Sequence, residues 1–158
     1  MTNERHLSIE CHAESSGKMR NDIRVTTTSG EGWDLATDEG PLLGGDATAP
    51  PPLALFVASL AGCLMTQIRM FARRLKIDVS TVRVDGVAKW VAITNERAPY
   101  TSESRGIELR ITLHGEHTTN EARELVEAAR LGCFVERSVE PATVIEHLLA
   151  VDEDWVRL

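Results

Sequence analysis

The three cysteines are the residues of this 158-residue chain whose chemistry is most distinctive. Cys11, Cys63 and Cys133 are too few and too scattered for a disulfide framework or a CxxC metal site. In a reducing compartment, a thiol that matters for function usually acts as a nucleophile or a redox group. The alternative for each cysteine is burial as a small apolar residue.

Cys63 lies in the middle of a stretch, residues 50–76, that is expected to form one helix. Three prolines lead into it, and proline suits a first helical turn because no amide donor is needed there. The first half is apolar and predicts burial on every side, and the second half is amphipathic and basic. A thiol so far inside a helix gains little from the helix dipole, and burial raises its pKa. A reactive Cys63 would therefore need a cation from elsewhere, and the simpler interpretation from the residues alone is a core cysteine.

Arg20 and Arg24 are two basic residues of the N-terminal part of the chain. They are four positions apart on an expected strand, residues 20–28, and so share one of its faces. From the residues alone, either arginine is a solvated strand residue. His114 and His117 flank a strand-to-helix turn, but a metal site needs a third ligand and none suggests itself. No metal or bound cofactor is therefore expected.

The surrounding pattern predicts an α+β fold, with antiparallel sheet, one dominant buried helix and a single domain over residues 1–158. Gly86 suggests a bulge, and Cys11 is expected in the core with Leu7 and Ile9. The alternating residues Ile107, Leu109, Ile111 and Leu113 should face inward. The expected strands are 5–14, 20–28, 33–36, 79–92, 106–114 and 142–151, with a helix as the alternative for 142–151. The expected loops are 38–52 and 94–104. A second helix, capped at Thr118, breaks at Gly132-Cys133 and resumes briefly over 134–139.

Composition excludes several classes of function. The net charge of −7 argues against a general nucleic-acid or membrane-surface binder, because such partners call for a basic face. The N-terminus has no basic region followed by an apolar run, so no signal peptide is expected. Residues 53–65 are too short to cross a bilayer, which takes ~20 apolar residues. A soluble, cytoplasmic protein is the expectation.

The text APPPLALFVASLAGC, which ends at Cys63, resembles the opening of the central helix in the OsmC/Ohr family of peroxide-handling proteins. Pro52, the Ala58-Ser59-Leu60 text and Cys63 fit that pattern. A β-rich N-terminal third and a second cysteine, Cys133, near the end of the next helix extend the resemblance over nearly the whole chain.

The resemblance implies a thiol-dependent peroxidase that reduces organic hydroperoxides. Cys63 would be the peroxidatic thiolate and Cys133 the resolving thiol, with an external dithiol reductant rather than a bound cofactor. Arg20, five residues before Val25, matches the family's activating arginine, and Arg24 is the alternative. The family also implies an antiparallel sheet wrapped on the central helix of an intertwined homodimer, with two sites at the interface and the arginine possible from either subunit.

This chain departs from the family pattern at two places. Family members carry a glutamate one or two positions after the proline, which holds the arginine, whereas Leu53 and Ala54 stand here. Asp46 is a candidate replacement. Phe134 stands where many relatives have proline. The missing glutamate motivates a second hypothesis, an OsmC-like scaffold that binds a small apolar ligand at the dimer interface without reducing peroxides. A structural domain with core cysteines is the third.

Overall fold

The computed structural model describes residues 4, 6–95, 98–139, 148–151 and 154–157. The chain divides into two compact units, Met1–Ala58 and Ser59–Leu158. Both units combine helix with antiparallel strands, so the predicted α+β class is confirmed.

The first unit contains a three-stranded antiparallel meander of β1 (Ile9–Ser15), β2 (Asn21–Thr27) and β3 (Gly32–Thr37), in the order β1-β2-β3. The turns are tight, and Gly17 and Gly30 have positive φ angles that favour glycine. The meander was predicted, but the inward position of Cys11 was wrong. Every residue of β1 is exposed, and among the described strands β1 pairs only with β2.

Helix α1 (Pro52–Leu75) is about 36 Å long at 1.5 Å per residue. It ends where Lys76 adopts a left-handed φ of 58° and the Ile77 N–H reaches back 3.0 Å to the Ala72 carbonyl, a Schellman-type stop. A short 3-10 helix, η1 (Pro41–Leu43), lies in the loop before α1.

Burial along α1 differs from the expectation. Its first turns are exposed or half-buried in the single chain, with Leu53 51% exposed and residues 55–57 half-buried, and full burial begins at Leu60. The prediction that the first half is buried on every side is therefore wrong for the chain by itself. By length and composition α1 is also long and apolar enough to cross a membrane, a test that core helices of soluble proteins pass as well.

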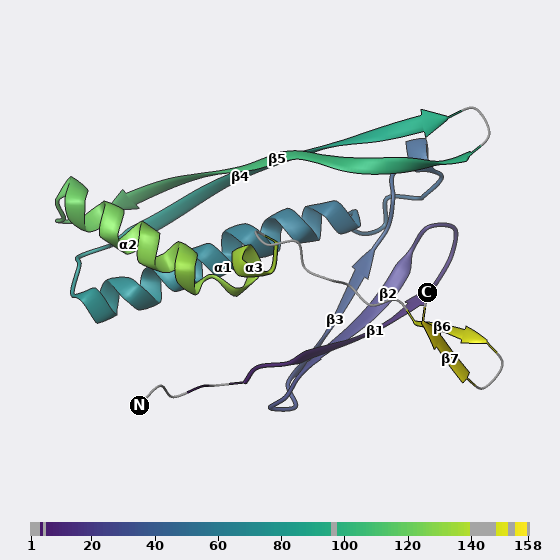
Figure 1. Cartoon of the computed structure of the whole chain (residues 1–158), viewed down its shortest axis with the longest axis horizontal. Helices are drawn as coiled ribbons and strands as arrows, with labels where there is room; N and C mark the ends of the chain where they lie inside the picture. Colours follow the sequence, from purple (N-terminus) through teal and green to yellow (C-terminus); the bar gives the residue numbers. More distant parts are fainter. Residues whose placement is uncertain (1–3, 5, 96–97, 140–147, 152–153, 158) are drawn as a thin grey trace. The chain divides into compact units, whose positions relative to one another are not determined.

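The second unit holds a long antiparallel hairpin of β4 (Thr81–Asn95) and β5 (Ala98–His114) (Figure 1). Gly86 pairs regularly with Leu109, and the ladder shifts register between Ala88 and Trp90 instead, so the predicted bulge at Gly86 was wrong. The loop predicted over residues 94–104 is mostly strand. The loop was predicted from the polar side chains of this segment. In an exposed two-stranded ribbon neither face has to be apolar, so polar residues can continue the strand.

Helix α2 (Thr119–Gly132) begins with the predicted cap. The Thr118 hydroxyl accepts from the Glu121 N–H at 3.2 Å, and the Glu121 carboxylate accepts from the Thr118 N–H at 2.7 Å, which forms a capping box. The predicted short helix follows as α3 (Phe134–Val139). The predicted last strand is present as β6 (Leu148–Val151), paired with β7 (Asp154–Arg157), while residues 142–147 lie outside the described residues.

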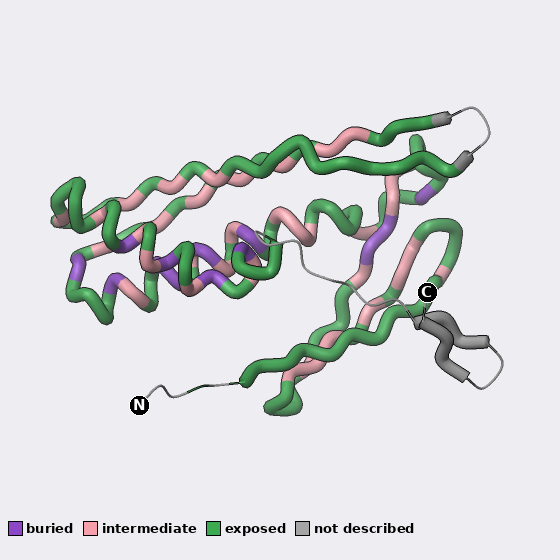
Figure 2. The backbone as a smooth tube through the Cα atoms, in the orientation of Figure 1, coloured by how far each residue is buried: buried purple, intermediate pink, exposed green. Residues whose placement is uncertain are grey.

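The core of the second unit lies where α1, α2 and the β4–β5 hairpin meet. Leu64 and Ile68 of α1 pack there with Leu125 and Ala129 of α2, and Leu109, Ile111 and Leu113 are partly buried against them as predicted, whereas Ile107 is exposed. Figure 2 shows buried positions in α1 and α2. Burying a side chain the size of leucine contributes about 2 kcal/mol. Cys133 also belongs to this core and is 0% exposed.

Candidate active site

Cys63 lies on the same side of α1 as the core. It is partly buried, and it packs against the buried cluster that contains Leu64, Ile68 and Cys133. The thiol therefore combines an apolar wall with partial access to solvent.

Cys133 lies at the break between α2 and α3. Its own N–H donates to the Arg130 carbonyl at 3.2 Å, and its carbonyl accepts from the Arg137 N–H at 2.9 Å. The Cys133 sulfur accepts from the backbone N–H of Glu136, as an N-cap side chain does in the first turn of a helix. The predicted break at Gly132-Cys133 thus fixes the backbone on both sides of the thiol.

The structure brings the two predicted redox cysteines together. The side chains of Cys63 and Cys133 are hydrogen-bonded to each other, and both carry free thiols. Burial raises the pKa of the Cys133 thiol to about 11, against the opposing hydrogen bond from the Glu136 N–H; the hydrogen bond with the Cys63 side chain and the charges of Cys63 and Glu136 add to the rise. Cys133 is therefore protonated at neutral pH and able to donate to the Cys63 sulfur.

Glu136 is a residue that the sequence analysis missed. It is 9% exposed, it lies 3.9 Å from the Arg130 guanidinium (Oε2 to Nε), and its backbone contacts Cys133. The sequence did contain one signal for this contact. Glu136 is the third residue of the helix that follows Cys133, and the backbone N–H at that position is the one that a capping side chain binds.

A cavity of about 560 Å³ lies beside this group within the second unit. Its walls come from α1, β5, α2 and α3, and aliphatic side chains predominate. The lining residues are Leu60, Leu64, Ser104, Ile107, Leu109, Ile111, Arg130, Glu136 and Val139. Leu60 and Leu64 flank Cys63 in the sequence of α1. The cavity can hold an apolar group and offers an ion pair at its wall.

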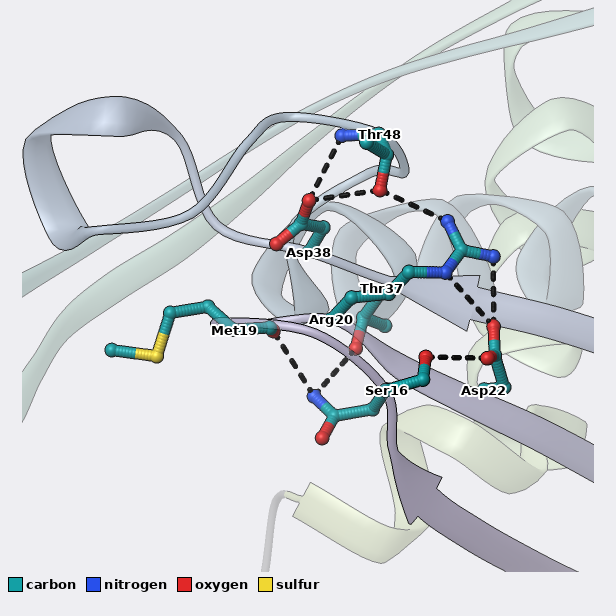
Figure 3. Close-up of polar contacts among 8 residues, drawn as sticks. Ser16, Met19, Arg20, Asp22, Thr37, Asp38 and Thr48 are labelled. Carbon is teal, nitrogen blue, oxygen red and sulfur yellow. Dashed lines mark hydrogen bonds and ion pairs between the residues drawn. The ribbon is translucent and has the colours of Figure 1, made fainter.

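Arg20 belongs to the first unit, where its guanidinium has well-defined partners (Figure 3). Its Nε and Nη2 donate to Asp22 Oδ1 at 3.0 and 2.7 Å, and its Nη1 donates to Thr48 Oγ1 at 3.0 Å. The Ser16 hydroxyl and, after it, the hydrogen bond from Arg20 hold the pKa of Asp22 below its usual range. Arg20 is therefore a charged donor fixed from two sides.

Asp38 is hydrogen-bonded to Thr48. Its Oδ2 accepts from both the N–H and the hydroxyl of Thr48, each at 2.9 Å, and the side chain is almost fully buried. The backbone N–H of Thr48 is the main cause of a lowered pKa at Asp38. The sequence analysis assigned neither residue a role at the site, since polar loop residues carry no periodic signal.

The other candidate residues have partners of their own. Asp46 contacts Lys18 at 2.6 Å, so the carboxylate suggested as a replacement is engaged with a lysine. Arg24, the alternative arginine, donates to Asp34, its cross-strand neighbour on β3, at 2.9 Å. The first turn of α1, which the structure describes in full, contains no acidic residue. Leu53 and Ala54 there are exposed.

The two histidines do not form a metal site with other side chains in the described part of the chain. No group of three or more His, Cys, Asp or Glu residues there is arranged to hold a metal ion. The His117 ring nitrogen Nδ1 lies 2.9 Å from the Asp78 carbonyl, which ties the start of α2 to the end of α1.

Comparison with protein families assigns the chain to a known family. Residues 44–147 match the family model of the OsmC-like proteins, a range that includes α1 and both Cys63 and Cys133. The chain belongs to the OsmC-like protein family.

Solved structures agree with this assignment. An OsmC-like hydroperoxide resistance protein from Jannaschia sp. CCS1 is 38% identical, with a TM-score of 0.67, over 96% of this chain and 98% of its own. An organic hydroperoxide resistance protein OsmC from Legionella pneumophila is 24% identical (TM-score 0.60; 90% and 94% covered), and an OsmC-like protein from Mycoplasma pneumoniae is 14% identical (TM-score 0.65; 89% and 91% covered). These two show the likeness of fold. No curated protein matched the chain.

Proposed function

We propose that this protein is a thiol-dependent peroxidase that reduces organic hydroperoxides, with Cys63 as the peroxidatic thiol and Cys133 as the resolving thiol. The observation that carries the proposal is the hydrogen-bonded contact between these two free thiols, one partly accessible and one fully buried. The hydroperoxide resistance protein from Jannaschia, at 38% identity, supports the substrate class.

In the first step the Cys63 thiolate attacks the terminal oxygen of the hydroperoxide. The S–O bond forms, the O–O bond breaks, and the leaving alkoxide takes a proton to become the alcohol. Cys63 is then a sulfenic acid. The guanidinium of Arg20 would stabilise the thiolate and the developing charge on the leaving oxygen.

In the second step the Cys133 sulfur attacks the Cys63 sulfenic sulfur. The S–S bond forms, and hydroxide leaves with the thiol proton as water. The negative charge of Cys63 is one cause of the high pKa of Cys133, and a neutral sulfenic acid removes that cause, so oxidation itself favours ionisation of the resolving thiol. A dithiol reductant then opens the disulfide and is itself oxidised, as expected in the cytoplasm.

The test is direct oxidation of the protein. Treatment with one equivalent of cumene hydroperoxide should lower the mass by two hydrogen atoms and yield a Cys63–Cys133 linked peptide. Cys63→Ser should abolish turnover with a dithiol, whereas Cys11→Ser, at an exposed thiol, is the matched control that should retain it. Unchanged free thiols after mild peroxide would refute the proposal.

The cavity favours a second candidate function, the binding of a small apolar ligand by a scaffold that does not reduce peroxides. Its aliphatic walls suit a hydrocarbon group, and its 560 Å³ falls in the usual range for ligand pockets. Ile107→Glu would place a charge at its wall and should weaken binding of a long-chain alcohol probe. Leu42→Glu, at an exposed leucine outside the cavity, is the control.

We further propose a homodimer. The apolar first turns of α1 are exposed in the single chain, and a second copy is the natural cover for them. Light scattering should then give twice the chain mass, and Leu53→Glu should shift the equilibrium towards monomer. A monomer at micromolar concentration would contradict this.

A further inference from the structure

Arg20 is held by a chain of hydrogen bonds whose direction is defined. The Thr48 hydroxyl has one proton, and the carboxylate Asp38 Oδ2, 2.9 Å away, can only accept it. The lone pairs of the Thr48 oxygen are then free to accept from Arg20 Nη1 at 3.0 Å. A hydroxyl can donate or accept a hydrogen bond. Because the buried Asp38 carboxylate takes the Thr48 proton, the Thr48 oxygen is left to accept from Arg20.

The loop that carries Thr48 is built closely against Asp38 and Glu39. The Asp38 N–H donates to the Pro50 carbonyl at 3.2 Å, and the Ala47 N–H donates to the Glu39 carbonyl at 3.0 Å. A Cβ on Gly45 would lie 1.9 Å from the Glu39 carbonyl oxygen, so only glycine fits there.

Ala47, next to Thr48, has a left-handed φ of 52°. A non-glycine residue persists in that region where its surroundings fix it, and such residues cluster at functional sites. The backbone before Thr48 is therefore held in an unfavourable conformation by the contacts that set the Thr48 hydroxyl in place.

We propose that Thr48, oriented by Asp38, is a positioning residue that together with Asp22 holds the Arg20 guanidinium towards its catalytic task. Thr48 and Asp22 together would do what a glutamate in the first turn of α1 could otherwise do, namely hold the guanidinium. The inference rests on the proposed function, since it presumes that Arg20 acts on the Cys63 thiolate.

The geometry of the guanidinium fits this role. Among the described residues, Asp22 and Thr48 take three of its five N–H groups, through Nε, Nη2 and Nη1. One N–H on each terminal nitrogen remains for a thiolate or a peroxide oxygen. Two acceptors on different segments, β2 and the loop before α1, restrict rotation of the side chain more than one acceptor would.

The test measures the reactivity of Cys63 rather than stability alone. The first measurement is the rate at which iodoacetamide alkylates Cys63 as a function of pH, in a Cys11→Ser/Cys133→Ser background. The second is kcat/KM for cumene hydroperoxide in a protein that retains Cys133. Thr48→Val should lower kcat/KM about tenfold, the loss of one hydrogen bond to a charged group, and should move the alkylation midpoint to higher pH. Asp38→Asn should act in the same direction.

Matched variants separate positioning from folding. Thr48→Ser keeps the hydroxyl and should retain the wild-type profile, and Asp46→Asn, in the same loop but paired with Lys18, should leave it unchanged. In an Arg20→Ala background, Thr48→Val should have no further effect on the midpoint.

The outcomes distinguish this inference from the proposed function. If Arg20→Ala moves the midpoint and Thr48→Val leaves it at the wild-type pH, the role of Thr48 is refuted and the peroxidase proposal stands. If Thr48→Val and Arg20→Ala still shift it additively, Thr48 does not act through Arg20 and the inference fails. If Cys63→Ser retains full turnover, the proposed function itself fails.

Discussion

The two groups of candidate residues lie in opposite physical environments. Arg20, Asp22 and Thr48 form a solvent-accessible polar network in which each charge is satisfied by hydrogen bonds. Cys63 and Cys133 belong to an apolar core that keeps one thiol protonated. Under the proposed function the two regions have separate tasks: the polar network would supply charge to the reaction, and the core would supply a second thiol that is protonated at neutral pH.

The largest effect expected concerns the core. Cys63→Ser should abolish peroxide turnover, because no other described thiol is both partly accessible and in contact with Cys133. Cys133→Ser should still consume one equivalent of peroxide and stop at the sulfenic acid, detectable with dimedone. Full turnover by Cys133→Ser with a dithiol would show that Cys133 is not needed for resolution.

The next effect concerns the polar network. Arg20→Ala should lower kcat/KM by about 100-fold, the magnitude typical of losing a charged donor that stabilises a transition state. Arg24→Ala is the matched control and should cost less than about threefold in rate, because Arg24 pairs with Asp34 on the neighbouring strand and such exposed pairs contribute little. Steady-state kinetics decide the comparison, and the reverse ranking would assign the activating role to Arg24.

A third prediction tests the core by pH. The pKa of Cys133 is raised in the folded protein to about 11, whereas an unfolded cysteine titrates near ~8.5. The stability that Cys133 contributes is therefore complete below the unfolded pKa and is lost as the pH rises towards 11. The expected loss in unfolding free energy between pH 8 and 11 is on the order of 2 kcal/mol.

Urea denaturation at several pH values measures this loss. Cys133→Ser should show a flatter dependence than the wild type over the same range. Identical curves would mean that the thiol is not the group responsible.

The smallest effect is expected at the first turn of α1. Ala54→Glu introduces a carboxylate into the first turn of α1, but Asp22 and Thr48 already hold Arg20, so kcat/KM should change by less than about threefold, within ~0.7 kcal/mol. Peroxidase assays of Ala54→Glu test this. A tenfold or greater gain would instead show that the wild type is impaired, and would favour the ligand-binding scaffold.

Local signals in the sequence were enough for most of the elements. Proline at the start of α1, the Thr118–Glu121 cap and the Gly132-Cys133 break each act within one helical turn, so neighbouring residues decide them. The β5 alternation was equally clear at Leu109, Ile111 and Leu113. The pattern around Cys63 was sufficient to name the family that residues 44–147 match.

Interactions between segments distant in the sequence could not be read in this way. The exposure of Cys11, the strand character of residues 98–104, and the exposed start of α1 all depend on which surfaces meet, which no local pattern encodes. The burial of Glu136 beside Cys133 likewise follows from the packing of α3.

The sequence by itself determined which residues are available, Cys63, Cys133 and Arg20 among them, and that the first helical turn after the prolines lacks a carboxylate, because these are matters of residue identity. Only the tertiary structure decided that the two thiols are in contact, and that Arg20 is bound by Asp22 and Thr48 rather than by Asp46. The physical reason is the distance along the sequence over which each interaction acts. Helix caps and strand alternation are set over a few residues, whereas hydrogen bonds such as Arg20 to Thr48 join segments that the fold brings together.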